Sequence, residues 1–121
     1  MYNDMVIFYL FHLSFMAPVI ITDETHFNKI VLQSTKPVIV DFFATWCGPC
    51  KRMSPIVDQF ALDNPNIVVV KVDVDKSSDL ASKYNISSIP TFVLFNKGQH
   101  ISQLSATSKI QLQQLLGLLK A

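Results

Sequence analysis

Residues 38–51 read VIVDFFATWCGPCK, an apolar run followed at once by two cysteines that have two residues between them. The apolar run at 38–43 is typical of a strand that is covered on both faces. The residues after Cys50 have helical spacing, so Cys47 is expected at the start of a helix, where free N–H groups and the helix dipole stabilise a thiolate. Thiol–disulfide exchange needs a second thiol close to the first. A redox dithiol is therefore the leading functional hypothesis, with Cys50 as the shielded resolving thiol.

The composition predicts one ordinary domain. The chain has 121 residues, of which 50% are hydrophobic, and this is enough for one core. The formal net charge of +1 and the charged fraction of 16% indicate no basic surface, so no nucleic-acid partner is expected. Two cysteines cannot make the multi-disulfide framework of a small secreted protein.

Residues 1–17 form an apolar N-terminal extension, and the domain is expected at residues 18–121. Residues 5–17 are interrupted only by His12 and Ser14, and this run is too short to span a bilayer comfortably. It has the length of a signal-peptide core, but no Lys or Arg precedes it and its end makes a poor cleavage site. Translation from Met16 is the preferred alternative. Membrane association is not expected.

The rest of the chain alternates between strand-like and helix-like segments. This order predicts an α/β domain, with a mixed central sheet and helices on both faces. Strands are expected at residues 19–21, 38–43, 67–74, 91–95 and 101–104, with a hairpin turn at 96–98. Helices are expected after an N-cap at Thr22, along the stripe 53–60, from Ser77 or Ser78 to Tyr84, and after a capping box at 108–111.

Several further residues accompany the stretch at 38–51: Ile89, Pro90, Thr91, Phe95 and Gly98. Together they resemble the thioredoxin family over residues 18–121, and WCGPCK is among the more specific short redox motifs. The resemblance implies the thioredoxin fold, with Cys47 as the attacking thiol and Cys50 as the resolving thiol. It also implies that Asp41 is a buried carboxylate that helps to move the Cys50 proton, and that Pro90 is a cis proline facing the dithiol.

The position of Asp41 in the sequence predicts a proton acceptor independently of the resemblance to the thioredoxin family. A carboxylate inside VIVDFF would be desolvated, which raises its pKa and suits it to accept a proton near neutral pH. Lys71, in the neighbouring strand, would moderate that shift and so tune the redox site. The alternative is that Asp41 ends its strand and reaches water.

Other residues near the cysteines are expected to shape substrate binding and redox poise. Trp46, beside the nucleophile, is expected to form an apolar platform for the substrate rather than to fill the core. Gly48 and Pro49 are turn residues that also tune the potential of the dithiol. Ser105 stands where the thioredoxin family usually has a glycine, and its side chain is expected to narrow the approach of the substrate backbone. The predicted substrate groove consists of Trp46, Ile89, Pro90 and Ser105.

No cofactor is expected beyond the redox-active Cys47–Cys50 disulfide. Structural zinc sites need four ligands, and the chain has no second CxxC and no paired histidines, so no metal site is expected. Nucleotide- and flavin-binding motifs are also absent from the sequence, so electrons must come from a partner. The resemblance implies an NADPH-dependent thioredoxin reductase as that partner and disulfide-containing proteins as substrates.

The predicted function is the reduction of protein disulfides by a cytoplasmic, monomeric electron carrier that takes part in electron transport and cell redox homeostasis. One alternative is an oxidant or isomerase of the secretory pathway, favoured if residues 1–17 act as a signal. Pro49 argues against it, because isomerases of this family usually carry His there. A second alternative is a binding subunit whose dithiol is incidental to its role.

Overall fold

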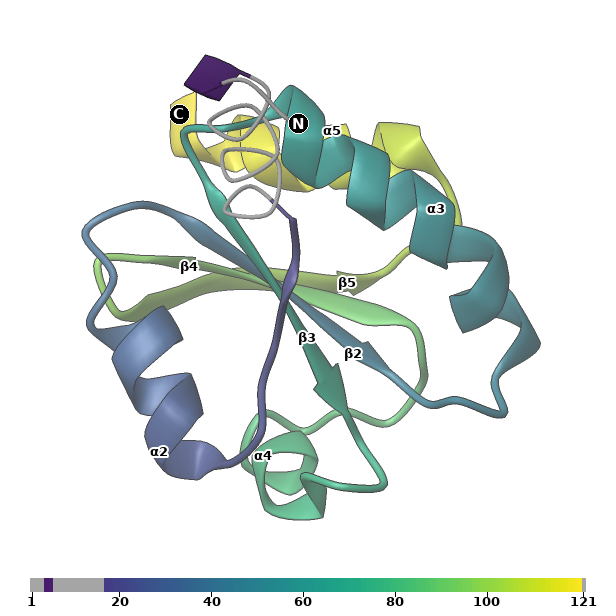
Figure 1. The fold of residues 1–121 in the computed structure, drawn as a ribbon. Helices are drawn as coiled ribbons and strands as arrows, with labels where there is room; N and C mark the ends of the chain where they lie inside the picture. Colours follow the sequence, from purple (N-terminus) through teal and green to yellow (C-terminus); the bar gives the residue numbers. More distant parts are fainter. Residues whose placement is uncertain (1–3, 6–16, 121) are drawn as a thin grey trace.

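The computed structural model describes residues 4–5 and 17–120, and within these ranges the β-branched segments form a five-stranded sheet (Figure 1). Residues 6–16, which hold most of the signal-like run and the start at Met16, lie outside the described residues. The strands follow the order β1-β3-β2-β4-β5 across the sheet. Their bounds are β1 (Val19–Ile20), β2 (Val38–Phe43), β3 (Val68–Asp73), β4 (Thr91–Asn96) and β5 (Gln99–Ser105).

Strand β2 lies at the centre of the sheet, as its continuous apolar sequence predicts. It pairs in parallel with β3 and antiparallel with β4, while β1 runs parallel to β3 on its other edge and β5 antiparallel to β4. In this register Asp41 of β2 lies opposite Lys71 on one side and opposite Phe92 on the other. The predicted mixed sheet is confirmed.

Helices cover both faces of the sheet, and two apolar cores lie between them (Figure 1). On one face, α3 (Gly48–Asp63) and α5 (Lys109–Gly117), which continues into η2 (Leu118–Lys120), pack over Ile39, Val69, Phe92 and Leu94. On the other, α2 (Glu24–Phe27), η1 (Asn28–Leu32) and α4 (Ser78–Lys83) pack over Val40, Phe42, Val70 and Phe95.

The first helix begins one residue later than predicted. The N-cap is Asp23, whose Oδ1 accepts the His26 N–H at 2.7 Å, and not Thr22. Thr22 instead donates its own N–H to the His26 Nδ1, at 3.1 Å. A carboxylate at the N-cap also interacts favourably with the helix dipole, which a hydroxyl does not do to the same degree.

The later caps lie where the sequence predicts them. Ser108 is the N-cap of α5 and accepts the Gln111 N–H at 3.4 Å. The Gln111 Oε1 reaches back to accept the Thr107 N–H at 2.8 Å, which completes a variant of the capping box. Ser77 is the N-cap of α4, although its side chain makes no capping hydrogen bond.

The β4–β5 hairpin packs its turn against the end of η1. Lys97 and Gly98 both have positive φ, 52° and 78°, as a two-residue type I′ turn requires. A Cβ added at Gly98 would lie 2.5 Å from the Leu32 carbonyl oxygen, a contact that real Cβ atoms do not make. Glycine is therefore favoured at position 98 for two reasons: the backbone has a left-handed conformation, and there is no room for a Cβ.

We expect Gly98→Ala to lower the free energy of unfolding by about 2–3 kcal/mol, because the new Cβ adds a backbone clash to an unfavourable left-handed conformation. Urea unfolding followed by circular dichroism measures this difference. Gly117→Ala is the matched control, since a Cβ there meets nothing within 4 Å and should leave stability unchanged or slightly raised. Equal effects of the two substitutions would contradict the close approach at Leu32.

Candidate active site

The two cysteines lie at the start of α3 and form a disulfide. Cys47 is the N-cap of the helix, and its Sγ accepts the Cys50 N–H at 3.2 Å. Both side chains are buried, 5% and 7% exposed. The position of Cys47 at a helix start is thus confirmed, and one of the free N–H groups of the first turn points at the sulfur that is predicted to attack.

Gly48 and Pro49 occupy the first turn of α3. Pro49 lacks the N–H that the first turn leaves without an intrahelical partner, so it fits there without loss of a bond. A Cβ at Gly48 would lie 3.6 Å from the nearest atom, an ordinary van der Waals contact with Arg52. Space alone therefore does not demand glycine at this position, and the redox-tuning role of the dipeptide stays a prediction.

The loop before β4 faces the disulfide. The Ile89–Pro90 peptide bond is cis, and the Ile89 carbonyl oxygen lies 3.9 Å from the Cys47 Sγ. Ile89 also packs against the small buried cluster that contains both cysteines and Ala44. The cis proline beside the dithiol, implied by the resemblance, is confirmed.

Ser105, at the end of β5, lies beside the same loop. Its hydroxyl is 2.8 Å from the Ser88 Oγ and 3.3 Å from the Thr91 Oγ1, and the Thr91 hydroxyl donates to the Ser88 carbonyl oxygen. The three hydroxyl groups thus join β4 and β5 across the residues that flank the cis bond. Whether Ser105 also narrows substrate approach stays a prediction.

Trp46 is exposed at the rim of the site. Its side chain is 67% accessible, which excludes the alternative of a core aromatic. The indole Nε1 donates to the Asp75 Oδ2 at 2.8 Å, and Asp75 is held in turn by its N–H, which donates to the Asp73 Oδ1. Asp75 was missed by the sequence analysis, because nothing in its local pattern connects it with a residue 29 positions earlier.

Asp41 is buried inside β2, on the face that α3 covers. It is 4% exposed, and its Oδ1 has no hydrogen-bond partner among the described residues. Burial raises its pKa to about 7, while Lys71 works in the lowering direction and Asp58 in the raising one. The strand continues to Phe43, so the alternative in which Asp41 ends the strand and reaches water is wrong.

A cavity of about 280 Å³ lies between Asp41 and Cys50. Asp41 and Cys50 both line it, together with Lys51, Ser54 and Lys71. The shared lining places the Asp41 carboxyl and the Cys50 side chain on one space, and the predicted transfer of the Cys50 proton to Asp41 stays a prediction.

Lys71 lies opposite Asp41 in the sheet, but its ammonium group binds elsewhere. The Nζ donates to the Asp58 Oδ1 at 3.0 Å and to the Ser54 Oγ at 3.1 Å. The predicted moderating effect on the pKa of Asp41 is confirmed in direction. Ser54 and Asp58 were missed by the sequence analysis. Their spacing of four residues places them on one face of α3, but it does not say what that face meets.

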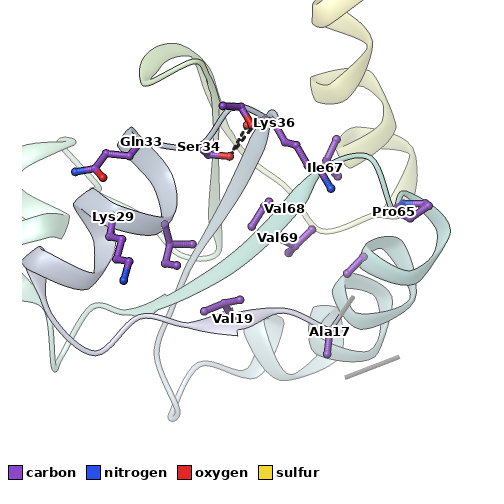
Figure 2. Close-up of a pocket in the computed structure, with 13 residues that line it drawn as sticks. Ala17, Val19, Lys29, Gln33, Ser34, Lys36, Pro65, Ile67, Val68 and Val69 are labelled. Atoms are coloured by element: carbon purple, nitrogen blue, oxygen red, sulfur yellow. Dashed lines mark hydrogen bonds between the residues drawn. The ribbon is translucent and has the colours of Figure 1, made fainter. Parts of the chain in front are cut away.

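The space around the dithiol is not the roomiest part of the surface. A cavity of about 590 Å³ lies between η1, β1, the start of β3 and the end of α3 (Figure 2). Val19, Val68 and Val69 line its apolar part, and Lys29 and Lys36 lie on its polar side (Figure 2). It contains none of the predicted site residues.

Two kinds of feature are absent from the part of the chain that the structure describes. In residues 4–5 and 17–120, no group of three or more His, Cys, Asp or Glu side chains is arranged to hold a metal ion. Over the same part of the chain, no helix has the length and apolar character needed to cross a membrane.

Comparison with known proteins identifies a family. The family model described as Thioredoxin matches residues 18–118. Thioredoxin 1 of Plasmodium falciparum is 40% identical over 97 residues, which cover 80% of this chain and 92% of that protein. The solved structure of Plasmodium falciparum thioredoxin superimposes with a TM-score of 0.77 at 38% identity, over 83% of this chain and 97% of that one.

Two further relatives are longer than the matched region. Thioredoxin-2 of Pyricularia oryzae is 44% identical over 88 residues, or 73% of this chain, but the match spans only 52% of that protein. A bifunctional thioredoxin reductase/thioredoxin of Mycobacterium leprae is 44% identical over 85 residues, which are 69% of this chain and 18% of that protein.

The raised pKa of Asp41 predicts how stability depends on pH. Between its ordinary value of 3.8 and about 7, the folded chain holds a proton on Asp41 that the unfolded chain releases. The contribution of Asp41 to stability is therefore complete below about pH 4, falls as the pH rises, and is fully lost above about pH 7.

We expect Asp41→Asn to match the parent protein in stability near pH 3, since both side chains are then neutral. At about pH 8 the variant should be more stable by up to about 4 kcal/mol, which corresponds to about three pKa units. Urea unfolding of both oxidised proteins at several pH values measures this. A difference that is the same at every pH would contradict the raised pKa.

Proposed function

The chain belongs to the thioredoxin family and is a thiol–disulfide oxidoreductase, and from that premise we propose that it reduces disulfides of cytoplasmic proteins through Cys47 and Cys50. The observation that carries this proposal is the Cys47–Cys50 disulfide at the start of α3, beside the cis Ile89–Pro90 bond. The structure has the dithiol in its oxidised state, which is the state that the protein reaches after it has reduced a substrate disulfide.

The first step is an attack on the substrate. In the reduced protein, the Cys47 thiolate attacks one sulfur of the substrate disulfide, the substrate S–S bond breaks, and a mixed disulfide forms. The released substrate thiolate takes up a proton. The N–H of Cys50, which points at the Cys47 sulfur, stabilises the attacking thiolate. Trp46, Ile89, Pro90 and Ser105 form the surface on which the substrate backbone lies.

The second step releases the substrate. The Cys50 thiol gives its proton to Asp41 across the 280 Å³ cavity and attacks the Cys47 sulfur. The mixed disulfide breaks, the second substrate thiolate leaves and is protonated, and the Cys47–Cys50 disulfide forms. Two electrons have then passed from the protein to the substrate. Gly48, Pro49 and Lys71 set how readily this exchange runs in the reducing direction.

The electrons return from a second protein. We infer that an NADPH-dependent thioredoxin reductase reduces the Cys47–Cys50 disulfide, because the chain has no motif for a nucleotide or flavin of its own. The relative from Mycobacterium leprae supports this, since its name joins a thioredoxin reductase to a thioredoxin. In this proposal the chain is a monomer without a cofactor. It acts as an electron carrier that is oxidised by substrates and reduced by that partner.

We expect the Cys47/Cys50 pair to have a reduction potential within about 30 mV of the −270 mV that is typical of thioredoxin. Equilibration with dithiothreitol buffers, followed by alkylation of free thiols, measures it. The Cys47→Ser, Cys50→Ser double variant is the control for background alkylation. A value near the −120 mV of the periplasmic oxidant DsbA would overturn the reducing direction and favour an oxidant of the secretory pathway.

We expect Asp41→Asn to slow release of the mixed disulfide by about 10–100-fold at pH 7, because an amide cannot accept the Cys50 proton. Stopped-flow reduction of a protein disulfide, with the intermediate trapped by acid, separates this step from the first attack. The defect should disappear near pH 9, where an ordinary thiol ionises without help. A defect that persists at pH 9 would contradict the role of Asp41 as a base.

A further inference from the structure

Two carboxyl groups, those of Asp41 and Asp58, lie on either side of Lys71, and its ammonium group hydrogen-bonds to that of Asp58. Lys71 lies directly across the β2–β3 pair from Asp41, and both side chains line the same cavity. An ammonium group in this place could pair with Asp41, the usual arrangement for a buried carboxylate beside a lysine. Instead, the Asp41 Oδ1 has no hydrogen-bond partner among the described residues.

The other partner lies on α3. Asp58 Oδ1 is 3.0 Å from the Lys71 Nζ, and Ser54 Oγ is 3.1 Å from it. Ser54 and Asp58 are one helical turn apart, so both face β3 from the same side of α3. The Lys71 side chain is only 13% exposed, whereas that of Asp58 is 55% exposed. The ammonium group of Lys71 thus binds a carboxylate that keeps much of its contact with water.

We propose that Ser54 and Asp58 are positioning residues: together they hold the Lys71 ammonium group on the α3 side of the cavity and leave the Asp41 carboxyl without a cationic partner among the described residues. The proposal rests on the function proposed above, since it concerns the group that accepts the Cys50 proton. A hydroxyl and a carboxylate outside the reacting groups would in this way set the pH at which the second step begins.

The groups that face Asp41 come from β3, β4 and α3. From β3 the facing group is Lys71, and from β4 it is the apolar side chain of Phe92. From α3 they are Cys50 and Lys51, which line the cavity, and Asp58, which acts on Asp41 by its charge. A movement of Lys71 toward Asp41 would bring a positive charge next to the carboxyl and favour its ionised form.

The test measures the titration of Asp41 itself. The carboxyl carbon of Asp41 is followed by NMR against pH in the oxidised protein, which needs no substrate and no reductase. We expect Asp58→Asn to lower the pKa of Asp41 by about one unit, the low end of the effect of a nearby opposite charge. Ser54→Ala should lower it in the same direction by a smaller amount, although it changes no charge.

A Lys71→Met background separates an effect of Asp58 that acts through Lys71 from direct repulsion between the carboxylates of Asp58 and Asp41. If Asp58 acts through Lys71, Asp58→Asn should shift the pKa of Asp41 less than half as much in this background, and Ser54→Ala should have no effect. Equal shifts by Asp58→Asn in both backgrounds, with no shift by Ser54→Ala in either, would overturn the proposal. Circular dichroism of each variant confirms that the fold is retained.

The pH profile of mixed-disulfide release gives the second measurement. Its acid limb should move to lower pH in Asp58→Asn by the same amount as the carboxyl titration. If the titration moves and the acid limb does not, Ser54 and Asp58 position Lys71 as proposed, and the role of Asp41 in the proposed function is the part that fails. If neither moves, the positioning proposal fails, whether or not Asp41→Asn slows release.

Discussion

Strand β2 is hydrogen-bonded along both edges, to β3 and to β4, and this double pairing determines where the other parts of the molecule can lie. Its side chains must be covered on both faces, so α3 and α5 pack on one and α2, η1 and α4 on the other. The strand ends at Phe43, four residues before Cys47, and the chain then turns straight into α3. The central strand therefore fixes the start of the helix that carries the dithiol. A site built on such a scaffold keeps its geometry while its sulfur atoms change partners.

The same burial has a cost at Asp41. A carboxyl group in the middle of β2 loses its contact with water, and no side chain among the described residues hydrogen-bonds to its Oδ1 in return. A carboxyl with a pKa of about 7 can both take and give a proton near neutral pH, which is the property that the proposed function needs at Asp41. Lys71 reduces the loss only from a distance, since Ser54 and Asp58 hold its ammonium group. Burial of Asp41 therefore lowers the stability of the fold above about pH 7, but in the proposed function it suits the carboxyl to exchange a proton.

The sequence predicts the parts of the fold that depend on local pattern. The bounds of β2, the hairpin turn at Lys97 and Gly98, and the Ser108 cap all follow from neighbouring residues, and the structure confirms them. The predicted start of the first helix was wrong by one residue. Thr22 and Asp23 are both good N-caps, and the local sequence does not decide between them. The partners of Trp46 and Lys71 were missed for a different reason. Each contact joins elements that are far apart in the chain, and no local pattern records which faces meet.

The tether between Trp46 and Asp75 has a practical consequence. The chain contains a single tryptophan, and this residue stands directly before the first cysteine with its indole ring held at the rim of the site. Light absorbed selectively by tryptophan is therefore emitted from one place only. The protein thus carries its own fluorescent reporter beside the dithiol, and the proposed binding of substrates there can be followed on the unmodified chain without an attached dye.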